Sequence, residues 1–363
     1  MKHNNQVHDN KKLLDKMMED LQGADELYKP TNYWSFYQKS ILPELKRKGL
    51  KDFRRRKSSL LTSFGATDLF LFALPKYEGR QYIRGLDRML RMCTYILNKL
   101  RIKLSINYPV AEITSYFFEY VKKKYENKSL NIFCCPTSFY GNPEDVKVIE
   151  KTPWSLEHLR VASMFIDTVP DIKFSNSMVF CELGPGLGRN IEILAKLYER
   201  ATFLMFDIPP QLYVSSQYLS AVFKDRVLGY EASSSIFPDK NGNIPDCAKG
   251  KIIVMPTWSM PVWSNTKIDI FWNSASFQEM EPHVVKNYLD LVKKMRPDFI
   301  YINALPEGNY WGEWKPGLGG TKEAVLEKYY LGFLEDKYSL LKKYYTDNLL
   351  RENKYMSYIL SNR

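Results

Sequence analysis

Three glycines at alternate positions, Gly184, Gly186 and Gly188, separate a short apolar run from an amphipathic one in the stretch SMVFCELGPGLGRNIEIL. The apolar run, residues 178–183, is typical of a buried strand, and residues 188–200 carry apolar side chains at helical spacing. A glycine turn between a buried strand and a helix is typical of an open α/β sheet, in which ligands bind beside the carboxyl ends of the strands. The turn therefore predicts both the class of fold and the place of a ligand.

The second half of the chain continues this alternation of strand and helix patterns. Short apolar runs predict four more strands, over residues 201–207, 251–256, 267–273 and 298–305. Amphipathic runs predict helices over residues 210–223 and 282–295. Such runs, bounded by turns and separated by helices, indicate a parallel sheet covered on both faces, and Tyr-rich runs within residues 338–360 predict a terminal antiparallel pair. We therefore expect an α/β, Rossmann-like domain over residues 151–363, with an insertion loop at 230–250.

The first 150 residues carry helical patterns instead, and we expect them to form a helical N-terminal domain. Apolar side chains recur at helical spacing over residues 11–21, 32–49, 81–100 and 110–125. Pro136, Gly141 and Pro143 then break the pattern and indicate a linker. The next helix, predicted at residues 153–169, leads into the strand before the glycine turn.

Composition limits the class of protein. Hydrophobic residues make up 45% of the chain and charged residues 26%, as in an ordinary globular protein. The first twenty residues have no apolar core, and the longest apolar stretch is too short to span a bilayer. We therefore expect a cytoplasmic protein. Five cysteines without a CxxC pair argue against a disulfide framework or a zinc ribbon.

Positive charge gathers in one run, KRKGLKDFRRRK, at residues 46–57. Lysine and arginine number 52 against 41 aspartates and glutamates, which gives a net charge of +11. The run is either a solvated helix face or a surface for anionic lipid, nucleic acid or a phosphate-bearing substrate. Charge alone does not choose among these interpretations.

The residues around the glycine turn limit the ligand that it can hold. A Walker loop ends in Gly-Lys-Ser/Thr, whereas Gly188 is followed by Arg189 and Asn190. The dinucleotide fingerprint needs its third glycine one position later, at Arg189. Glu182 precedes the turn by two residues, which disfavours a pyrophosphate but suits a sulfonium or an ammonium. Asp207, at the end of the next strand, is placed to accept hydrogen bonds from a ribose. A turn that serves packing alone is the alternative.

This combination resembles the class I S-adenosylmethionine-dependent methyltransferases over residues 150–363. The resemblance implies S-adenosylmethionine (SAM) as cofactor, with its methionine end at the glycine turn and its ribose at Asp207. Many such enzymes place an acidic residue after the third strand to reach adenine, whereas this chain has VMPTWSMP, so Met255, Pro256 or Trp258 would stack on that ring instead. The cofactor residues expected on this basis are Glu182, Gly184, Gly186, Gly188, Asp207, Met255 and Asn273.

Longer stretches resemble a narrower family. FDIPPQLYVSSQYL, DIFWNSASFQEM and the YGNP before the domain are similar to the sugar O-methyltransferases of bacterial surface-polysaccharide gene clusters. That family pairs a helical N-terminal region with a methyltransferase domain. The resemblance implies methyl transfer to a sugar hydroxyl of a nucleotide- or lipid-linked glycan or a surface polysaccharide, with residues 1–150 as a candidate acceptor region. A phosphate on the acceptor, or peripheral association with an anionic inner membrane face, would explain the basic run.

The chemistry of the acceptor can be narrowed from the residues. Methylation of a base nitrogen usually needs an Asn/Asp-Pro-Pro-aromatic turn after the fourth strand, where this chain has Asn273-Ser274-Ala275-Ser276, and carbon methylation of pyrimidines needs a cysteine near that turn. A hydroxyl fits better, and it needs a base or strict alignment with the methyl group. The candidate bases are Glu279, His283 and, less directly, His158.

Each of these candidates also has a structural interpretation. Glu279 can cap a helix, and His283 can lie on the surface at a helix start. Glu279, Glu281 and His283 together could hold a magnesium ion, although their spacing is not diagnostic, and we expect no metal. After the last parallel strand, NALPEGNYWGEWKPGLGG places aromatic rings among glycines, which suits a sugar ring, so Tyr310, Trp311 and Trp314 are the expected substrate contacts. A loop packed on its own rings is the alternative.

Two further functions compete with sugar O-methylation. An RNA methyltransferase would use residues 46–57 as its electrostatic contact, but no RNA-binding motif with interleaved aromatic residues accompanies that run, so nucleic acid is not the expected partner. A non-catalytic module would keep the fold without turnover, and the intact acids and glycines argue against it. The sequence does not define the sugar, the hydroxyl or the oligomeric state.

Overall fold

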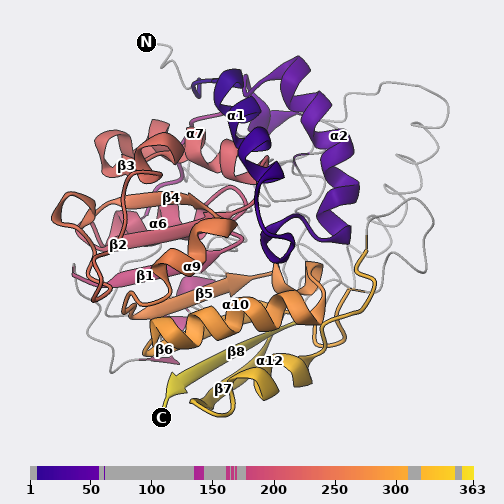
Figure 1. Cartoon of the computed structure of the whole chain (residues 1–363), viewed down its shortest axis with the longest axis vertical. Coiled ribbons are helices and arrows are strands. Elements are labelled where there is room, and N and C mark those ends of the chain that lie inside the picture. The colour runs from indigo at the N-terminus through magenta and orange to yellow at the C-terminus, as the bar shows by residue number, and fades with distance from the viewer. Residues whose placement is uncertain are drawn as a thin grey trace, which may run out of the picture.

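The computed structural model describes residues 6–56, 61, 135–142, 161–163, 165–166, 168–169, 177–309, 320–347 and 354–363. Within these residues, eight strands form one sheet in the order β3-β4-β2-β1-β5-β6-β8-β7 (Figure 1). Neighbouring strands from β3 to β6 are parallel, and β8 is antiparallel to both β6 and β7. The expected α/β sheet with a terminal antiparallel pair is confirmed. The strands are β1 (Val179–Leu183), β2 (Thr202–Asp207), β3 (Val227–Leu228), β4 (Ile252–Pro256), β5 (Ile270–Ser274), β6 (Phe299–Ala304), β7 (Tyr338–Asp347) and β8 (Lys354–Asn362).

Helices cover both faces of this sheet. One face is covered by α6 (Arg189–Leu197) and α7 (Gln211–Phe223), and α1 (Lys11–Gln22) and α2 (Asn32–Lys48) share the hydrophobic cluster of that face. The other face is covered by α9 (Met260–Trp263), α10 (Pro282–Met295) and α12 (Glu327–Leu334). The remaining elements are short: α8 (Tyr230–Ser233), η1 (Glu26–Tyr28), η2 (Phe53–Arg55), η6 (Lys224–Arg226), η7 (Asp246–Ala248), η8 (Thr257–Ser259) and η9 (Phe277–Glu279).

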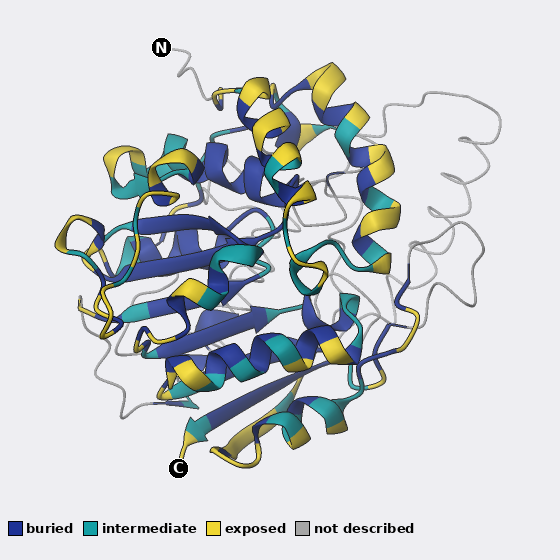
Figure 2. Cartoon of the chain, in the orientation of Figure 1, coloured by how far each residue is buried: buried dark blue, intermediate teal, exposed yellow. Residues whose placement is uncertain are grey.

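The two faces of the sheet carry separate hydrophobic clusters because successive strand residues point to opposite sides. Phe180 and Phe203 pack in the cluster under α1, α2, α6 and α7, whereas Cys181 and Leu204 pack in the cluster under α9, α10 and α12. The central strands are buried on both sides, as Figure 2 shows. This double burial is the physical reason that the strands appear in the sequence as continuous apolar runs.

The described N-terminal helices share their core with the sheet domain. Met17 of α1 and Ile41 of α2 lie in the same hydrophobic cluster as Tyr213 of α7, and Tyr213 Oη donates to Asp9 Oδ1 at 2.6 Å. In Figure 1, α1 and α2 lie at the end of the sheet toward which β1, β2 and β5 point. A separate domain over residues 1–150 stays a prediction, but its described part packs on the sheet domain.

Several local expectations differ from the structure or lie outside its described residues. The two-residue strand β3 was not predicted, because Val227 and Leu228 are too few to form a pattern. Residues 230–250, expected as a loop, include α8 and η7. The helices predicted at 81–100 and 110–125, and most of the helix at 153–169, lie outside the described residues.

The basic run at residues 46–57 is only in part a surface. Arg54 is fully buried, and its Nη1 donates to Ser138 O at 2.5 Å, Tyr140 O at 3.0 Å and Tyr218 Oη at 3.3 Å. Arg56 Nη2 donates to backbone oxygens of residues 48, 49 and 51. Treating the whole run as one solvated or ligand-binding face is therefore wrong for these two arginines.

Among the described residues, no helix has the length and apolarity that a bilayer span requires.

Candidate active site

The glycine turn joins β1 to α6 at the carboxyl edge of the sheet. The order of strands reverses beside β1, with β2 on one side and β5 on the other, and ligands of open α/β sheets bind at such a reversal. All three glycines have positive φ, which L side chains rarely adopt. At Gly184, a Cβ would also lie 2.5 Å from Ser276 Cβ, and at Gly188 it would lie 2.9 Å from Leu219 Cδ1. At these two positions a side chain would therefore collide with neighbouring protein, and at Gly186 the φ of 59° by itself favours glycine.

Two buried carboxyl groups stand beside this turn. Asp207 Oδ2 accepts from the Gly186 amide at 3.1 Å, and its Oδ1 accepts from the Ile208 amide at 2.8 Å. Glu182 Oε1 accepts from Asn190 Nδ2, on the first turn of α6, at 2.8 Å. The structure therefore brings the turn and both expected acids together.

Burial changes the acidity of both groups. The pKa of Glu182 is raised to about 8. The loss of hydration is the main cause and the nearby Asp207 adds to it, whereas the hydrogen bond from Asn190 lowers the pKa. Burial likewise raises the pKa of Asp207 to about 7, although two backbone amides lower it. Two acids held in one buried place favour a cation and disfavour a phosphate.

Asn273 links the loop after β5 to the end of β1, just before the glycine turn. Its Nδ2 donates to Leu183 O at 3.0 Å and to Ser276 Oγ at 2.6 Å, and its Oδ1 accepts from the Phe277 amide at 3.2 Å. Asn273 is fully buried, so its observed contacts shape the turn from below. Its role as a cofactor contact stays a prediction.

The residues expected at the adenine ring lie at the end of β4. Met255 is buried in the hydrophobic cluster under α9 and α10, whereas Trp258, on η8, is half-buried. Asp207 is paired in register with Pro256, so the end of β4 lies beside the expected ribose position. The adenine contact stays a prediction. Among Met255, Pro256 and Trp258, the side chain of Trp258 is the most accessible.

The start of α2 crosses the carboxyl edge of the sheet. Thr257 Oγ1, after β4, donates to Tyr28 O at 2.8 Å, and Gln38 Nε2 donates to Pro209 O, after β2. Thr31 Oγ1 donates to the backbone oxygen of Glu279, after β5, at 2.7 Å. One short N-terminal segment thus contacts the loops after three strands and covers the edge at which the glycine turn lies.

Glu279 lies under this segment, at the end of η9. Its Oε2 accepts from Trp34 Nε1 at 3.0 Å, and the Glu279 amide donates to Ser276 O at 3.0 Å. His283, by contrast, is exposed on the first turn of α10. In the described part of the chain, no three histidine, cysteine or acidic side chains are placed to hold a metal ion, so Glu279, Glu281 and His283 form no such cluster.

His158, Tyr310, Trp311 and Trp314 lie outside the described residues, and their roles stay predictions. The sequence reasoning missed Trp34 and Thr31, which contact the site from the N-terminal region. The aromatic density of NYWSFYQ at a helix start could have drawn attention to this segment, but its apolar spacing also fits an ordinary helix stripe.

No protein-family model and no curated protein matches the sequence. Similar solved structures include magnesium protoporphyrin IX methyltransferase from Synechocystis PCC 6803 with bound SAH (13% identity, TM-score 0.41, covering 68% of this chain and 99% of that chain). A SAM-dependent methyltransferase from Aquifex aeolicus is 14% identical (TM-score 0.33, 54% and 88% covered). The mitomycin 7-O-methyltransferase MmcR is 8% identical (TM-score 0.35, 70% and 69% covered). At these values, what this chain binds has to be argued from its own residues.

Proposed function

We propose that this chain is a SAM-dependent O-methyltransferase that acts on a sugar hydroxyl of a nucleotide- or lipid-linked glycan. The observation that carries the proposal is the pair of buried acids, Glu182 and Asp207, at the glycine turn. SAM presents a sulfonium, an ammonium and a ribose, whereas dinucleotides and nucleoside triphosphates present anionic phosphates. Buried carboxyls suit the first kind of ligand and not the second.

The residues of the turn fit the cofactor. Gly186 lets its backbone approach the ligand, and Glu182 would attract the cationic methionine end. Asp207 keeps a free lone pair on each oxygen after its two backbone contacts and can accept from both ribose hydroxyls. When bound, SAM supplies an electrophilic methyl group on a positively charged sulfur.

Glu279 is the residue that we assign as base. An alcohol is a weak nucleophile at neutral pH and gains from a carboxylate that takes its proton. As the acceptor oxygen forms its bond to the methyl carbon, the carbon–sulfur bond breaks, its electron pair stays on sulfur, and the hydroxyl proton passes to the Glu279 carboxylate. His283 and His158 stay the alternative bases.

The sugar acceptor is supported by the resemblance of residues 206–219 and 269–280 to sugar O-methyltransferases. The RNA alternative loses support because Arg54 and Arg56, in the run proposed to bind RNA, are engaged in contacts within the protein. A non-catalytic module that bound no cofactor would leave the pair of buried acids without a function, although buried carboxyls cost stability.

Methyl transfer tests the proposal directly. The protein is incubated with SAM that carries a radiolabelled methyl group and with three acceptor sets: nucleotide sugars, lipid-linked glycans and total RNA. Label is expected in a glycan arm. Label in RNA alone would support the alternative, and tight SAM binding without label in any arm would support the non-catalytic module.

Replacing Asp207 by asparagine is expected to weaken SAM binding by about 10- to 150-fold. This range corresponds to the about 1.5–3 kcal/mol of a hydrogen bond to a charged group. Asparagine keeps the volume and one of the two acceptors, so it can still accept from the Gly186 or the Ile208 amide while its NH2 faces the other. Calorimetry with SAM measures the loss, and the exposed Asp246→Asn is the matched control. Unchanged affinity in a folded Asp207→Asn variant would remove Asp207 from the site.

SAM binding is expected to release protons. Burial raises the pKa of Glu182 to about 8 and that of Asp207 to about 7, so the free protein holds both carboxyls partly protonated at neutral pH. A bound cation favours the ionised forms, so affinity rises as the pH increases from about 6 to 8. Calorimetry in phosphate and in Tris measures the released protons as a difference in heat. Equal heats in the two buffers, or affinity that falls with pH, would contradict a cation at this site.

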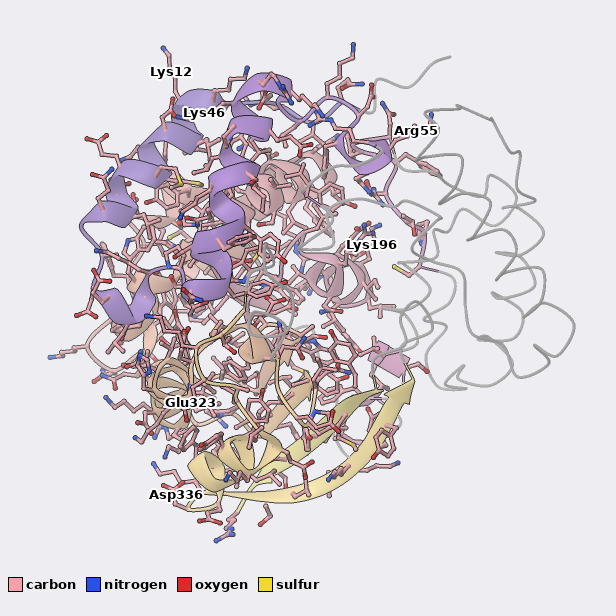
Figure 3. All side chains as sticks on the ribbon, turned by 90° about the vertical axis from the view of Figure 1, so that its right-hand side faces the viewer. Lys12, Lys46, Arg55, Lys196, Glu323 and Asp336 are labelled. Atoms are coloured by element: carbon pink, nitrogen blue, oxygen red, sulfur yellow. The ribbon has the colours of Figure 1, made fainter. Side chains whose placement is uncertain are left out.

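We also propose that the exposed part of the basic run meets phosphate groups on the acceptor or on a membrane. Figure 3 shows Lys12, Lys46 and Arg55 at one end of the molecule and Glu323 and Asp336 at the other. Reversing Arg47, Lys51 and Arg55 to glutamate is expected to raise the acceptor KM or to release the protein from phosphatidylglycerol vesicles, less so at high salt. The matched control reverses the exposed Lys240, Lys249 and Lys328. Equal effects of both triples would restore the solvated-face interpretation.

A further inference from the structure

The side of α2 that faces the sheet carries a regular stripe. Trp34, Gln38, Ile41 and Leu45 are buried at helical spacing, so this side of the helix lies against the carboxyl edge. The segment before and at the helix start contacts the loops after β2, β4 and β5. The first turns of α2 and the strand ends beside the glycine turn therefore lie at the same edge of the sheet.

Trp34 and Thr31 both contact Glu279, one through its carboxylate and one through its backbone oxygen. An indole N–H can only donate. Donation to a carboxylate favours the charged form and fixes the rotamer, which are the two properties that a base needs. The loop that carries Glu279 touches the glycine turn, because Ser276 packs against Gly184.

Two tyrosines flank Trp34 on the same helix. The ring centroids of Tyr33 and Tyr37 are 4.8 Å apart, and those of Tyr33 and Trp34 are 5.2 Å apart. Tyr33 and Tyr37 are half-buried at positions i and i+4, so their rings lie on the same side of the helix, tilted by 55° to each other. Aromatic faces with polar tips suit a sugar ring, which has apolar faces and hydroxyls at its rim.

We propose that the first two turns of α2 form the acceptor side of the active site. Trp34 is a positioning residue that holds Glu279 charged and aimed, and Tyr33 and Tyr37 form the wall against which the sugar ring packs. This inference rests on the proposed function, and it assigns acceptor recognition to the N-terminal region.

The positioning role is tested by Trp34→Phe, which keeps an aromatic ring and removes the N–H. In spectra of ¹⁵N-labelled protein, which has seven tryptophans, the indole signal absent from this variant identifies Trp34. That signal is expected to shift with pH as Glu279 titrates in the wild type and to lose this shift in Glu279→Gln. A Trp34 signal that ignores pH in the wild type, or that titrates equally in Glu279→Gln, would overturn the positioning role without any acceptor being known.

Trp34→Phe also gives a kinetic test, for which the substrate is the acceptor that receives the methyl label in the transfer assay. We expect kcat to fall about tenfold, the effect of losing one hydrogen bond to a charged group. The acid limb of the pH–rate profile moves to higher pH, because the carboxylate loses a donor, while the KM for SAM stays unchanged. A purely structural role would lower kcat without moving the profile, and that outcome would contradict the proposal.

The wall is tested by binding in the presence of S-adenosylhomocysteine (SAH). Protein saturated with SAH is titrated with UDP-glucose, UDP-galactose and GDP-mannose, and separately with catechol. Replacing Tyr33 and Tyr37 by alanine is expected to weaken sugar binding at least about tenfold and to leave SAH affinity unchanged, whereas the exposed Tyr345→Ala is the control.

The other outcomes of this titration separate the wall from the proposed function. Sugars bound equally by wild type and by the double variant would overturn the wall while the function stands. Dependence on Tyr33 and Tyr37 for catechol alone would overturn the carbohydrate class. A wild type that binds SAH but none of these nucleotide sugars, and that transfers no label to lipid-linked glycans, would refute the sugar acceptor and the wall together.

Discussion

Replacing Glu279 by glutamine is expected to lower kcat by about 10²- to 10⁴-fold, the usual effect of removing a general base. Glutamine keeps the length of the side chain and an oxygen that accepts from the Trp34 indole, so the contact between α2 and η9 persists. SAM affinity is expected to stay nearly unchanged, because Glu182 and Asp207 hold the cofactor in the proposed site. The loss therefore belongs to the chemical step, as steady-state kinetics with calorimetry on the same variant would show.

The control for this prediction is Glu335→Gln, a carboxyl lost from the exposed end of α12. Full activity in Glu279→Gln would refute Glu279 as base. If His283→Ala alone then slowed turnover, the base would lie on α10. If neither variant mattered, catalysis would rest on alignment or on His158.

Replacing Arg54 by methionine is expected to reduce the free energy of unfolding by about 1–3 kcal/mol for each buried acceptor that loses its donor, because methionine offers no hydrogen to the backbone oxygens of Ser138 and Tyr140. Arg54 lies over the Tyr218 ring, and Tyr218 Oη donates to Glu192 Oε2 at 2.6 Å. Glu192 is buried, and the pKa of its carboxyl is lowered because Lys196 and Arg54 outweigh the loss of hydration. Without Arg54, Lys196 is left to stabilise the charge of the Glu192 carboxylate.

The neighbouring Arg55 is the matched control, because it is exposed and differs from Arg54 only in its surroundings. Arg55→Met is expected to change stability by no more than about 0.5 kcal/mol. Urea unfolding of the two variants measures the difference. Equal stabilities would mean that the buried contacts of Arg54 with residues 138, 140 and 218 contribute nothing net.

Much of the fold follows from local patterns. Five of the parallel strands, the helices α6, α7 and α10 and the terminal antiparallel pair could be predicted, because burial on both faces leaves continuous apolar runs between turns. The helices α8, α9 and α12 were not predicted. Strand β3 could not, since two residues form no pattern and it exists by pairing with β4. The positions of Glu182, the glycines and Asp207 were also predictable, because a strand end and the turn after it are local features.

The contacts made across the fold are what the sequence alone could not supply. Trp34 and Glu279 are 245 residues apart along the chain, and their hydrogen bond exists because α2 lies across the carboxyl edge of the sheet. Arg54 and Arg55 are adjacent and chemically identical in the sequence, yet one is buried and the other exposed. Residue type and spacing therefore determined the sheet and the turn, whereas the environment of each side chain was decided by long-range packing, which local periodicity does not encode.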